Sequence, residues 1–499
     1  MNFLEEWFAP DFNKPSFLIG RWIWLRALGG IFFSVFYSLY FQIHGLIGPN
    51  GLLPAEAFLE AVRHAIGWKR YWLIPSLLWI HAGDRALDVL VWTGFAASLA
   101  IIVNLWPRVS IAVAGICFLS FIAVAQDFAS YQSDGMLLEA ALLSIFLAPR
   151  GLRPGLAADR PPSKASLFLL RWEWFRIYFE SGVVKILSGE PQWRDLTAMD
   201  KYYENGPLPT WIGWYVQHWP HAFHAGSAAF TLIAELLIAW LAFFPKWSKR
   251  IAFILTTPLQ IGIILTANYA FLNYLVLFLG FLLVDDEWFR GLEVARSRGS
   301  DSETAQPRDL ATWPAAVVLP IIFVTTVASF FLPYFPTVVM LEPYRVANSY
   351  GLFAIMTRAR YEIEFQGTAD GKTWIAYPFP YKPQDVRKPP GIYAPYQPRF
   401  EWNLWFASLG TWVANRWVLN TEVRLLQNQP AVLQLFAGNP FASKPPQAVR
   451  AMQWQYWFTS VEERNKTGAW WRRELIGQYA PTARRMPDGT IEIETTETP

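Results

Sequence analysis

Apolar runs long enough to cross a membrane recur along most of this chain and limit its fold more than any other feature. A transmembrane helix needs about 20 consecutive apolar residues. Runs near that length begin around Trp22, Ala86, Arg108, Ser166, Gly226, Ser248 and Trp313. Two shorter runs, 135–147 and 269–284, can cross only where neighbouring helices shield them. We therefore predict a polytopic α-helical membrane protein with about nine transmembrane helices.

Composition predicts that part of the chain folds outside the membrane. The hydrophobic share of 53% is higher, and the charged share of 16% lower, than in ordinary soluble proteins. A mean hydropathy of +0.20 is nevertheless too low for a chain that lies wholly in a membrane. We predict a C-terminal β-rich α+β extramembrane domain. The expected divisions are a helical bundle over 1–290, a cytoplasmic linker over 291–312, the last transmembrane helix over 313–335 and an extracytoplasmic C-terminal domain over 336–499.

Basic residues predict the orientation. With nine spans, most loop lysines and arginines fall on the N-terminal side of the membrane, in loops around 150–164, 246–250 and 290–308. The positive-inside rule then places the N-terminus in the cytoplasm, and an odd number of spans places the C-terminal domain outside. The acidic start, MNFLEEWFAPDF, lacks the pattern of a cleaved signal, so the first apolar run is expected to stay as an anchor.

Several function classes lose support at this stage. A net charge of +3, scattered along 499 residues, does not form the clustered basic face that nucleic acid requires. The only cysteine, Cys117, excludes an intrachain disulfide and a CxxC site. No HExxH, GxSxG, P-loop or GxGxxG motif occurs in a usable context. We expect no cofactor and no nucleic-acid partner.

The predicted helix over 166–187 carries charges that lipid cannot surround. Each unpaired charge at mid-bilayer costs roughly 2.5 to 3.5 kcal/mol. The helix must therefore be covered by protein on two sides or line a wet cavity. At 100° per residue, Glu173, Arg176 and Glu180 share one face, and Arg171 and Lys185 lie on the opposite one.

Glu139, Glu235 and Arg26, which lie in other apolar runs, are the expected partners of this helix. Ion pairs that fix helix register are one interpretation, and a polar intramembrane site is the other. If the protein is an enzyme, the candidate catalytic residues are Lys185, Glu180, Glu173 and Arg176. A desolvated Lys185 is the candidate base.

His218, His221 and His224 are spaced three apart before a predicted membrane helix. Imidazoles at this spacing are a candidate metal site. Pro220 interrupts the spacing and no carboxylate is near in the sequence, so we favour ordinary interfacial histidines and expect no metal.

The C-terminal part shows strand and helix patterns. Residues 358–367 alternate apolar and polar side chains, an Asp-Gly turn follows at Asp370, and 374–381 resume as a second strand, which predicts a hairpin. Over 399–410 and 421–436, apolar residues recur every three or four positions, and this spacing indicates helices. The tryptophans of this part are expected to be core for the most part, with contact surface as the alternative: Trp402, Trp405, Trp454, Trp457, Trp470 and Trp471.

Six long segments carry a family resemblance: SGVVKILSGEPQWRDLTAMDKYYENGPLPT from Ser181, NYAFLN from Asn268, YRVANSYGLFAIMT from Tyr344, YAPYQPRFEWNLWFASLG from Tyr393, NPFASKPPQAVRAMQWQYWF from Asn439 and GAWWRRELIGQYAP from Gly468. In this order they resemble the lipase maturation factor family over nearly the whole chain. The resemblance implies a membrane-embedded, chaperone-like factor that helps secreted lipases or other exported hydrolases to mature, with the C-terminal domain outside and facing the client. The single cysteine and short tail look like a bacterial member, in the inner membrane, rather than one of the endoplasmic reticulum (ER).

Ten residues are the candidate contact site, because arginine and aromatic side chains are favoured at contact surfaces. They are Tyr344, Arg345, Asn348, Tyr350, Gly351, Arg358, Gln397, Pro398, Arg399 and Trp402. For Gly351, Pro398 and Asp370 a role in setting turns is an equal alternative. Expected partners are a secreted lipase or other exported client and membrane lipid. The charged helix also looks distantly like vitamin K-dependent carboxylases, which gives the alternative of a membrane enzyme that modifies a peptide or lipid.

Overall fold

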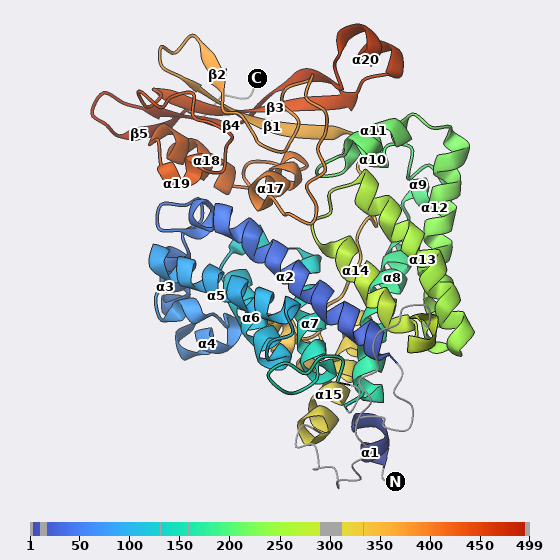
Figure 1. Ribbon diagram of the computed structural model, residues 1–499. Helices are drawn as coiled ribbons and strands as arrows, with labels where there is room; N and C mark the ends of the chain where they lie inside the picture. Colours follow the sequence, from blue (N-terminus) through green and yellow to red (C-terminus); the bar gives the residue numbers. More distant parts are fainter. Residues whose placement is uncertain are drawn as a thin grey trace.

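The computed structural model describes residues 3–9, 17–129, 131–157, 160–289, 312–332 and 334–494. Most helices form a bundle, and a five-stranded sheet with its own helices lies over one end of that bundle (Figure 1). Helix α1 (Phe3–Phe8) lies at the end of the molecule opposite the sheet. The predicted linker over 291–312 falls outside the described residues except for Thr312.

All nine predicted runs are helical. The helices of these runs are α2 (Leu18–Ile47), α5 (Asp84–Ile102), α6 (Pro107–Ile122), α7 (Gln132–Leu147), α8 (Lys164–Leu187), α12 (His221–Leu236), α13 (Lys246–Thr266), α14 (Leu272–Gly280) and α15 (Thr312–Phe331). Further helices between and after them are α3 (Ala55–Ile66), α4 (Arg70–Leu73), α9 (Pro191–Arg194), α10 (Tyr202–Asn205), α11 (Trp211–Gln217) and α16 (Pro336–Leu341). Short 3-10 segments extend α12 and α14, over Ile238–Phe243 and Phe281–Leu283.

The predicted number of transmembrane helices is not confirmed. Within the described residues, five helical segments are long and apolar enough to cross a membrane: 18–47, 84–102, 221–243, 246–266 and 313–331. Two further apolar helices, 107–122 and 272–283, are shorter. Helix α8 has the length but carries too many charges, and α7, with 16 residues, is short.

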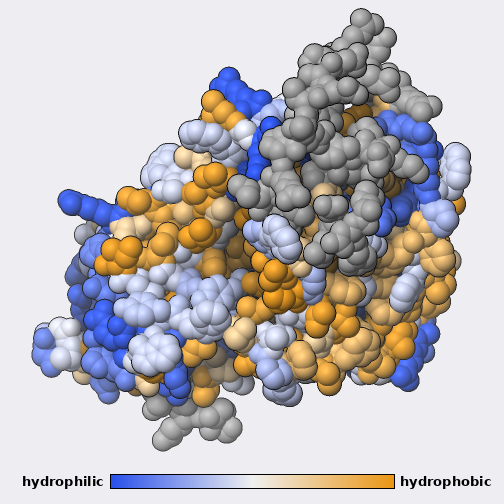
Figure 2. Space-filling model, turned by 90° about the horizontal axis from the view of Figure 1, so that it is seen from below, coloured by the Kyte–Doolittle hydropathy of each residue, from blue (hydrophilic) through white to orange (hydrophobic). Residues whose placement is uncertain are grey.

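The bundle surface presents many exposed apolar side chains. Leu237, Trp240, Phe244, Trp247, Ile251 and Ile254 are all exposed along α12 and α13. Seen from below, hydrophobic residues cover much of the molecule around the region drawn in grey (Figure 2). A soluble monomer rarely exposes such a surface, whereas a bilayer covers it at no cost.

Helix α8 lies inside the bundle, as its charges required. It packs against α7, α12 and α14, and Glu173, Arg176, Glu180 and Lys185 are all buried. Ser163 caps its first turn by accepting a hydrogen bond from the backbone N–H of Ser166. Of the two predicted alternatives, protein cover and a cavity, the structure shows protein against α8 on more than one side, and part of α8 also lines a cavity.

The C-terminal part is a sheet with helices packed on one face. The strands are β1 (Arg360–Thr368), β2 (Trp374–Ala376), β3 (Ala448–Phe458), β4 (Trp471–Arg485) and β5 (Ile491–Glu494), all antiparallel in the order β2-β1-β3-β4-β5. The helices are α17 (Arg399–Ser408), α18 (Trp417–Leu426), α19 (Pro430–Leu433) and α20 (Val461–Thr467). The predicted hairpin and both predicted helical stretches are confirmed, but the second strand ends at Ala376 and not at Tyr381, because Pro378 and Pro380 have no N–H for strand pairing.

The hairpin turn forms for the expected reason. Gly371 has φ +73°, which glycine adopts without strain. The Asp370 carboxylate accepts hydrogen bonds from the backbone N–H groups of Lys372 and Thr373, and these bonds lower its pKa to about 2. A turn-setting role therefore accounts for Asp370.

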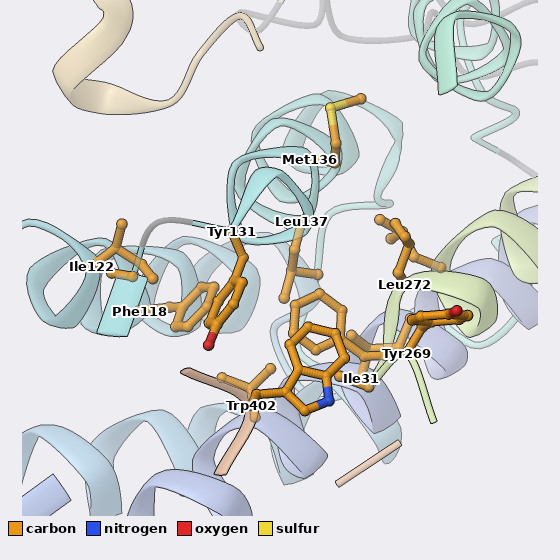
Figure 3. Packing of buried hydrophobic residues seen from close by; sticks show 14 of the residues in the cluster. Ile31, Phe118, Ile122, Tyr131, Met136, Leu137, Tyr269, Leu272 and Trp402 are labelled. Atoms are coloured by element: carbon orange, nitrogen blue, oxygen red, sulfur yellow. The ribbon is translucent and has the colours of Figure 1, made fainter. Parts of the chain in front are cut away.

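One large apolar core runs through both parts of the molecule, and a smaller cluster comprises Trp214, Tyr456, Phe458 and Trp471. Trp402 of α17 meets Tyr131 edge to face at 5.3 Å and lies 6.5 Å from Tyr269, with Leu137 and Leu272 close by (Figure 3). Trp405 and Trp471 are also buried, whereas Trp454, Trp457 and Trp470 are half-buried. The tryptophans thus divide evenly between core and partly exposed positions.

Candidate functional site

An irregular segment, 345–358, leads from α16 and a 3-10 turn over Glu342–Tyr344 to the sheet and contacts α8. Arg176 of α8 contacts Glu139 of α7 and donates a hydrogen bond of 2.7 Å to the backbone carbonyl of Asn348. Glu139 accepts hydrogen bonds of 3.1 Å from both the backbone and the side-chain amide of Asn348. Glu180, one turn along α8, accepts a hydrogen bond of 2.6 Å from the backbone N–H of Tyr350. The charged face of α8 therefore holds this segment.

Further side chains of the bundle bind the backbone of the same segment. Gln132 accepts a hydrogen bond from the N–H of Gly351, and a Cβ at Gly351 would lie 3.0 Å from Val184. Ser188, Trp193 and Asn205 donate 2.8 Å hydrogen bonds to the carbonyls of Ala354, Phe353 and Thr357 respectively. These bonds satisfy backbone groups that no secondary structure pairs.

A second polar joint lies at the start of α17. The two terminal guanidinium nitrogens of Arg399 each donate a 2.8 Å hydrogen bond to the carboxylate of Asp134. The backbone N–H of Gln397 binds Ser38 of α2, and its carbonyl accepts a hydrogen bond from Gln42. Pro398 immediately precedes the helix. Asp134 and Arg399 are each about 1% exposed, so this ion pair is sealed inside the joint.

The ten candidate contact residues thus mostly face the protein itself. Seven of them lie at the two joints, which are the contacts of segment 345–358 with α8 and the contacts at the start of α17. These seven are Asn348, Tyr350, Gly351, Gln397, Pro398, Arg399 and Trp402. Tyr344 meets Trp72 edge to face, and the Arg345 carbonyl accepts a hydrogen bond from Asn348. Arg358 is different, because its side chain is 75% exposed and lies 3.8 Å from Glu190. Client binding by these residues stays a prediction.

Of the other charges of α8, Arg171 and Lys185 find partners, and Arg171 donates a 2.9 Å hydrogen bond to the carbonyl of Leu282. Glu173 does not, because both of its oxygens are buried with no hydrogen-bond partner among the described residues. Lys185 donates a 2.8 Å hydrogen bond to Glu235 of α12 and lies over the Trp193 ring. The proposed partnership of Arg26 with this helix is wrong, because Arg26 donates to the carbonyls of Ile102 and Trp22 instead. Register-fixing ion pairs account for most of the charges that the sequence pattern singled out.

A cavity of about 480 Å³ opens beside the Lys185–Glu235 pair. Helices α8, α12, α13 and α14 line it, mainly with apolar side chains that include Phe223, Phe230 and Ile263. A second cavity of about 350 Å³ lies between the bundle and α17, with Trp402 and Trp405 in its wall. Both cavities share Tyr202, Tyr269 and Phe353. The charges of 166–187 allowed a cavity beside α8 as one of two alternatives, whereas no signal in the sequence indicated the second cavity.

The three histidines do not gather around one point. His218 binds the carbonyls of Trp214 and Thr459, His221 pairs with Asp200, and His224 binds the carbonyl of Trp219. The described residues contain no group of histidine, cysteine, aspartate and glutamate side chains that could hold a metal ion. The metal-site candidate is therefore not supported.

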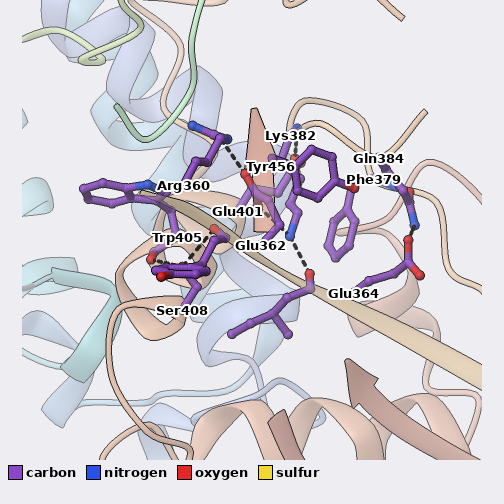
Figure 4. A network of polar contacts seen from close by, with 12 residues as sticks. Arg360, Glu362, Glu364, Phe379, Lys382, Gln384, Glu401, Trp405, Ser408 and Tyr456 are labelled. Carbon is purple, nitrogen blue, oxygen red and sulfur yellow. Dashed lines mark hydrogen bonds and ion pairs between the residues drawn. The ribbon is translucent and has the colours of Figure 1, made fainter. Parts of the chain in front are cut away.

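A polar network inside the C-terminal part was missed by sequence reasoning. Lys382 lies 2.9 Å from Glu362 of β1, and the backbone N–H of Tyr381 donates a 3.0 Å hydrogen bond to Glu401 of α17 (Figure 4). Burial raises the pKa of Glu401 to about 8, despite these hydrogen bonds and the nearby Lys382. Periodicity shows a glutamate on a helix but not the loop that covers it.

Strands β2, β3 and β4 bear stacked arginine and tryptophan side chains. Arg450 lies 4.0 Å above the Trp374 ring, and Arg473 lies 4.2 Å above Trp454. These four side chains are half-buried, and Leu475 beside Trp454 is 47% exposed. The composition is that of protein contact surfaces. We call Trp374, Arg450, Trp454 and Arg473 the outer patch.

Comparison with known families decides the relationship. Residues 19–291 match the model described as the lipase maturation factor transmembrane domain, and residues 346–481 match the lipase maturation factor C-terminal domain. The chain belongs to the lipase maturation factor family. Lipase maturation factor 1 of Bos taurus is 30% identical over 94% of this chain and 90% of its own length.

Other family members are similar to the same extent. Lipase maturation factor 2 of Gallus gallus is 30% identical over 95% of this chain and 82% of its own length. Lipase maturation factor 2 of Homo sapiens is 29% identical over 95% of this chain and 83% of its own length. No solved structure matches this chain. These relatives are vertebrate proteins, so the expected bacterial origin gains no support. Their names also do not favour the carboxylase-like alternative.

Proposed function

We propose that this chain is an integral membrane maturation factor that assists the folding or assembly of a secreted lipase or another exported hydrolase. The observation that carries the proposal is the match of both its parts to one family, whose members above are named for lipase maturation. The tight joints between bundle and sheet agree with a unit that works as a whole.

The outer patch is the surface that we propose for the client. It combines arginine with half-buried aromatic rings on strands β2, β3 and β4. Both kinds of side chain contribute strongly to binding, because tryptophan buries a large area with few rotatable bonds and arginine offers five N–H donors. Arg358, the exposed member of the sequence-predicted site, is a further contact in this proposal.

The orientation and the membrane are part of the proposal. Basic loops favour a cytoplasmic N-terminus, and the C-terminal sheet would then meet clients outside the cytoplasm. We propose the ER membrane if the source is eukaryotic and the inner membrane if it is bacterial. Membrane lipid is the second proposed partner, because exposed apolar side chains cover α12 and α13.

The test measures lipase maturation in cells that lack their own maturation factor. The protein is expressed with a secreted lipase, and enzyme activity per mass of secreted lipase is recorded. We expect Trp374→Ala combined with Arg450→Ala to lower this specific activity and to abolish crosslinking to the lipase. Ile375→Ala is the matched control, because Ile375 is exposed on the opposite side of the same strand.

A Lys185→Met variant separates the proposal from the enzyme alternative. In a factor that acts by binding, this variant lowers lipase activity only as far as the amount of folded protein falls. Complete loss of activity at a normal protein level and normal thermal stability would overturn the binding mechanism. Equal activity of the outer-patch variant and the unchanged chain would remove the outer patch from the proposal.

A further inference from the structure

We propose that the 480 Å³ cavity between α8, α12 and α13 binds an uncharged single-chain lipid with a hydroxyl-bearing headgroup, such as a monoacylglycerol. The inference deepens the lipid part of the proposed function and rests on it only for the presence of a membrane. It adds a site, a class of ligand and the atoms that recognise the headgroup.

The shape and walls of the cavity suit an acyl chain. Its volume lies within the range of about 300 to 1,000 Å³ that is usual for small-molecule sites. Phe223, Phe230, Ile263, Leu272 and Val276 supply apolar wall from three helices. An empty cavity of this size would forfeit dispersion contacts on every side, so a chain that fills it stabilises the bundle.

The polar end of the cavity selects the headgroup. Glu235 accepts one hydrogen bond from Lys185 through Oε1, and its other oxygen, Oε2, is buried with no hydrogen-bond partner among the described residues. Gln260, Asn273 and Tyr178 also reach the cavity but bind one another at 2.8 Å. The free acceptor of Glu235 therefore calls for a ligand that donates a hydrogen bond.

Charge argues for an uncharged ligand. Lys185 and Glu235 compensate each other inside the bundle, where an extra charge would be costly. A fatty-acid carboxylate would place a second anion beside the free oxygen of Glu235, and it would donate no hydrogen bond to that oxygen. A hydroxyl headgroup satisfies the oxygen and adds no charge.

Access from the bilayer follows from the cavity's position. Helices α12 and α13, which lie side by side at the edge of the bundle, belong to the segments able to cross a membrane (Figure 1). Phe223 and Leu265 line the cavity and are 40% and 43% exposed, and Gly262 is also exposed at its wall. A lipid can thus enter sideways between these helices.

The experiment uses the purified full chain in detergent and a monoacylglycerol that carries a photoreactive diazirine on its acyl chain. Labelled residues are mapped by mass spectrometry. We expect saturable labelling of α12 and α13 at cavity-lining positions. Unlabelled monooleoylglycerol should compete, whereas oleate and phosphatidylcholine should compete about tenfold less well, as expected when one hydrogen bond to a charged group is lost.

Two glycines provide a matched pair of variants. A Cβ built at Gly262, in the cavity wall, or at Gly226, outside it, meets no atom within 4 Å. Gly262→Phe should reduce labelling to background, and Gly226→Phe should leave it unchanged. Both proteins should unfold at the temperature of the unchanged chain. If Gly262→Phe does not fold, competition by unlabelled lipids for labelling of the unchanged chain tests the proposal.

Three outcomes would overturn the proposal: equal labelling of both variants, labelling confined to the outer surface of the bundle, or competition by oleate or phosphatidylcholine as strong as that by monooleoylglycerol. None of these measurements involves a client. A failed lipid site therefore leaves the maturation role open, and intact lipid labelling in a chain that does not mature lipase would contradict only that role.

Discussion

At the scale of single residues, the buried ion pairs at the two joints make the stability of the fold sensitive to the loss of one charged side chain. Arg399 and Asp134 are 265 positions apart in the sequence and meet through two 2.8 Å hydrogen bonds. Fully formed, such a pair contributes little net stability, because its desolvation offsets its attraction. Removal of one partner is costly, because the other charge then stays buried and alone.

Arg399→Met is therefore expected to lower the free energy of unfolding by about 3 to 5 kcal/mol. Arg358→Met is the control, since Arg358 is 75% exposed and its 3.8 Å ion pair with Glu190 should contribute at most about 1 kcal/mol. The measurement is the thermal unfolding midpoint of both variants in detergent. Equal midpoints would show that the Arg399 joint is not a structural element.

Glu401 should make the stability of the C-terminal part depend on pH. Its pKa is raised to about 8 in the folded protein, so between the ordinary glutamate pKa and about pH 8 the folded state holds a proton that the unfolded state has lost. Stability contributed by this proton is present at low pH and decreases as pH rises, by up to about 1.4 kcal/mol per pH unit.

Thermal unfolding of the unchanged chain and of Glu401→Gln between pH 5 and about pH 8 tests this. Glutamine keeps an oxygen acceptor for the N–H of Tyr381 but does not titrate. We expect the variant to lose part of the decrease in midpoint with pH. Parallel curves for the two proteins would argue that Glu401 stays ionised in the folded state.

At the scale of elements, close approach between α2 and α19 joins the bundle to the sheet part. A Cβ at Gly45 of α2 would lie 2.6 Å from the Ala431 carbonyl oxygen and 2.7 Å from the Leu435 side chain. Only glycine allows this distance, because backbone atoms cannot move away as a flexible side chain can.

We expect Gly45→Ala to destabilise the protein by about 1 to 3 kcal/mol through overpacking. Gly30 on the same helix is the control, since its Cβ would meet no atom within 4 Å. Gly30→Ala should be neutral or stabilising by up to about 1 kcal/mol, because alanine favours helix. Limited proteolysis between bundle and sheet reports the difference, and equal digestion of both variants would count against the close approach.

Two strands show how an element can escape prediction. No strand was predicted over β3 or β4, although they form the centre of the sheet. Their pairing shifts register at three places, so buried residues do not alternate over the length of β4. Such irregularities break the period of two on which strand prediction depends.

At the scale of the whole molecule, orientation can be measured because the only cysteine, Cys117, is buried. A cysteine introduced at exposed Lys466 of α20 or exposed Arg153 then becomes a single reporter. In intact cells or sealed microsomes, we expect a membrane-impermeant maleimide to label Lys466→Cys and Arg153→Cys from opposite sides of the membrane. Labelling of both from one side would contradict the odd number of spans.

Local pattern in the sequence was enough to predict several features of this protein. Runs of apolar residues specify the helices, alternation with Asp370 and Gly371 specifies the hairpin, and the charges of 166–187 require a protein-covered helix, because lipid cannot solvate them. Glu139 and Glu235 were predicted as partners on the same ground, and they pair with Arg176 and Lys185.

Only the tertiary structure decided which distant groups meet. It turned most of the sequence-predicted contact residues inward, to hold backbone groups at the joints, and it left Arg358 exposed. It also produced the outer patch and the cavity with its free Glu235 oxygen. These features depend on contacts between residues tens to hundreds of positions apart, and no local period records such distances.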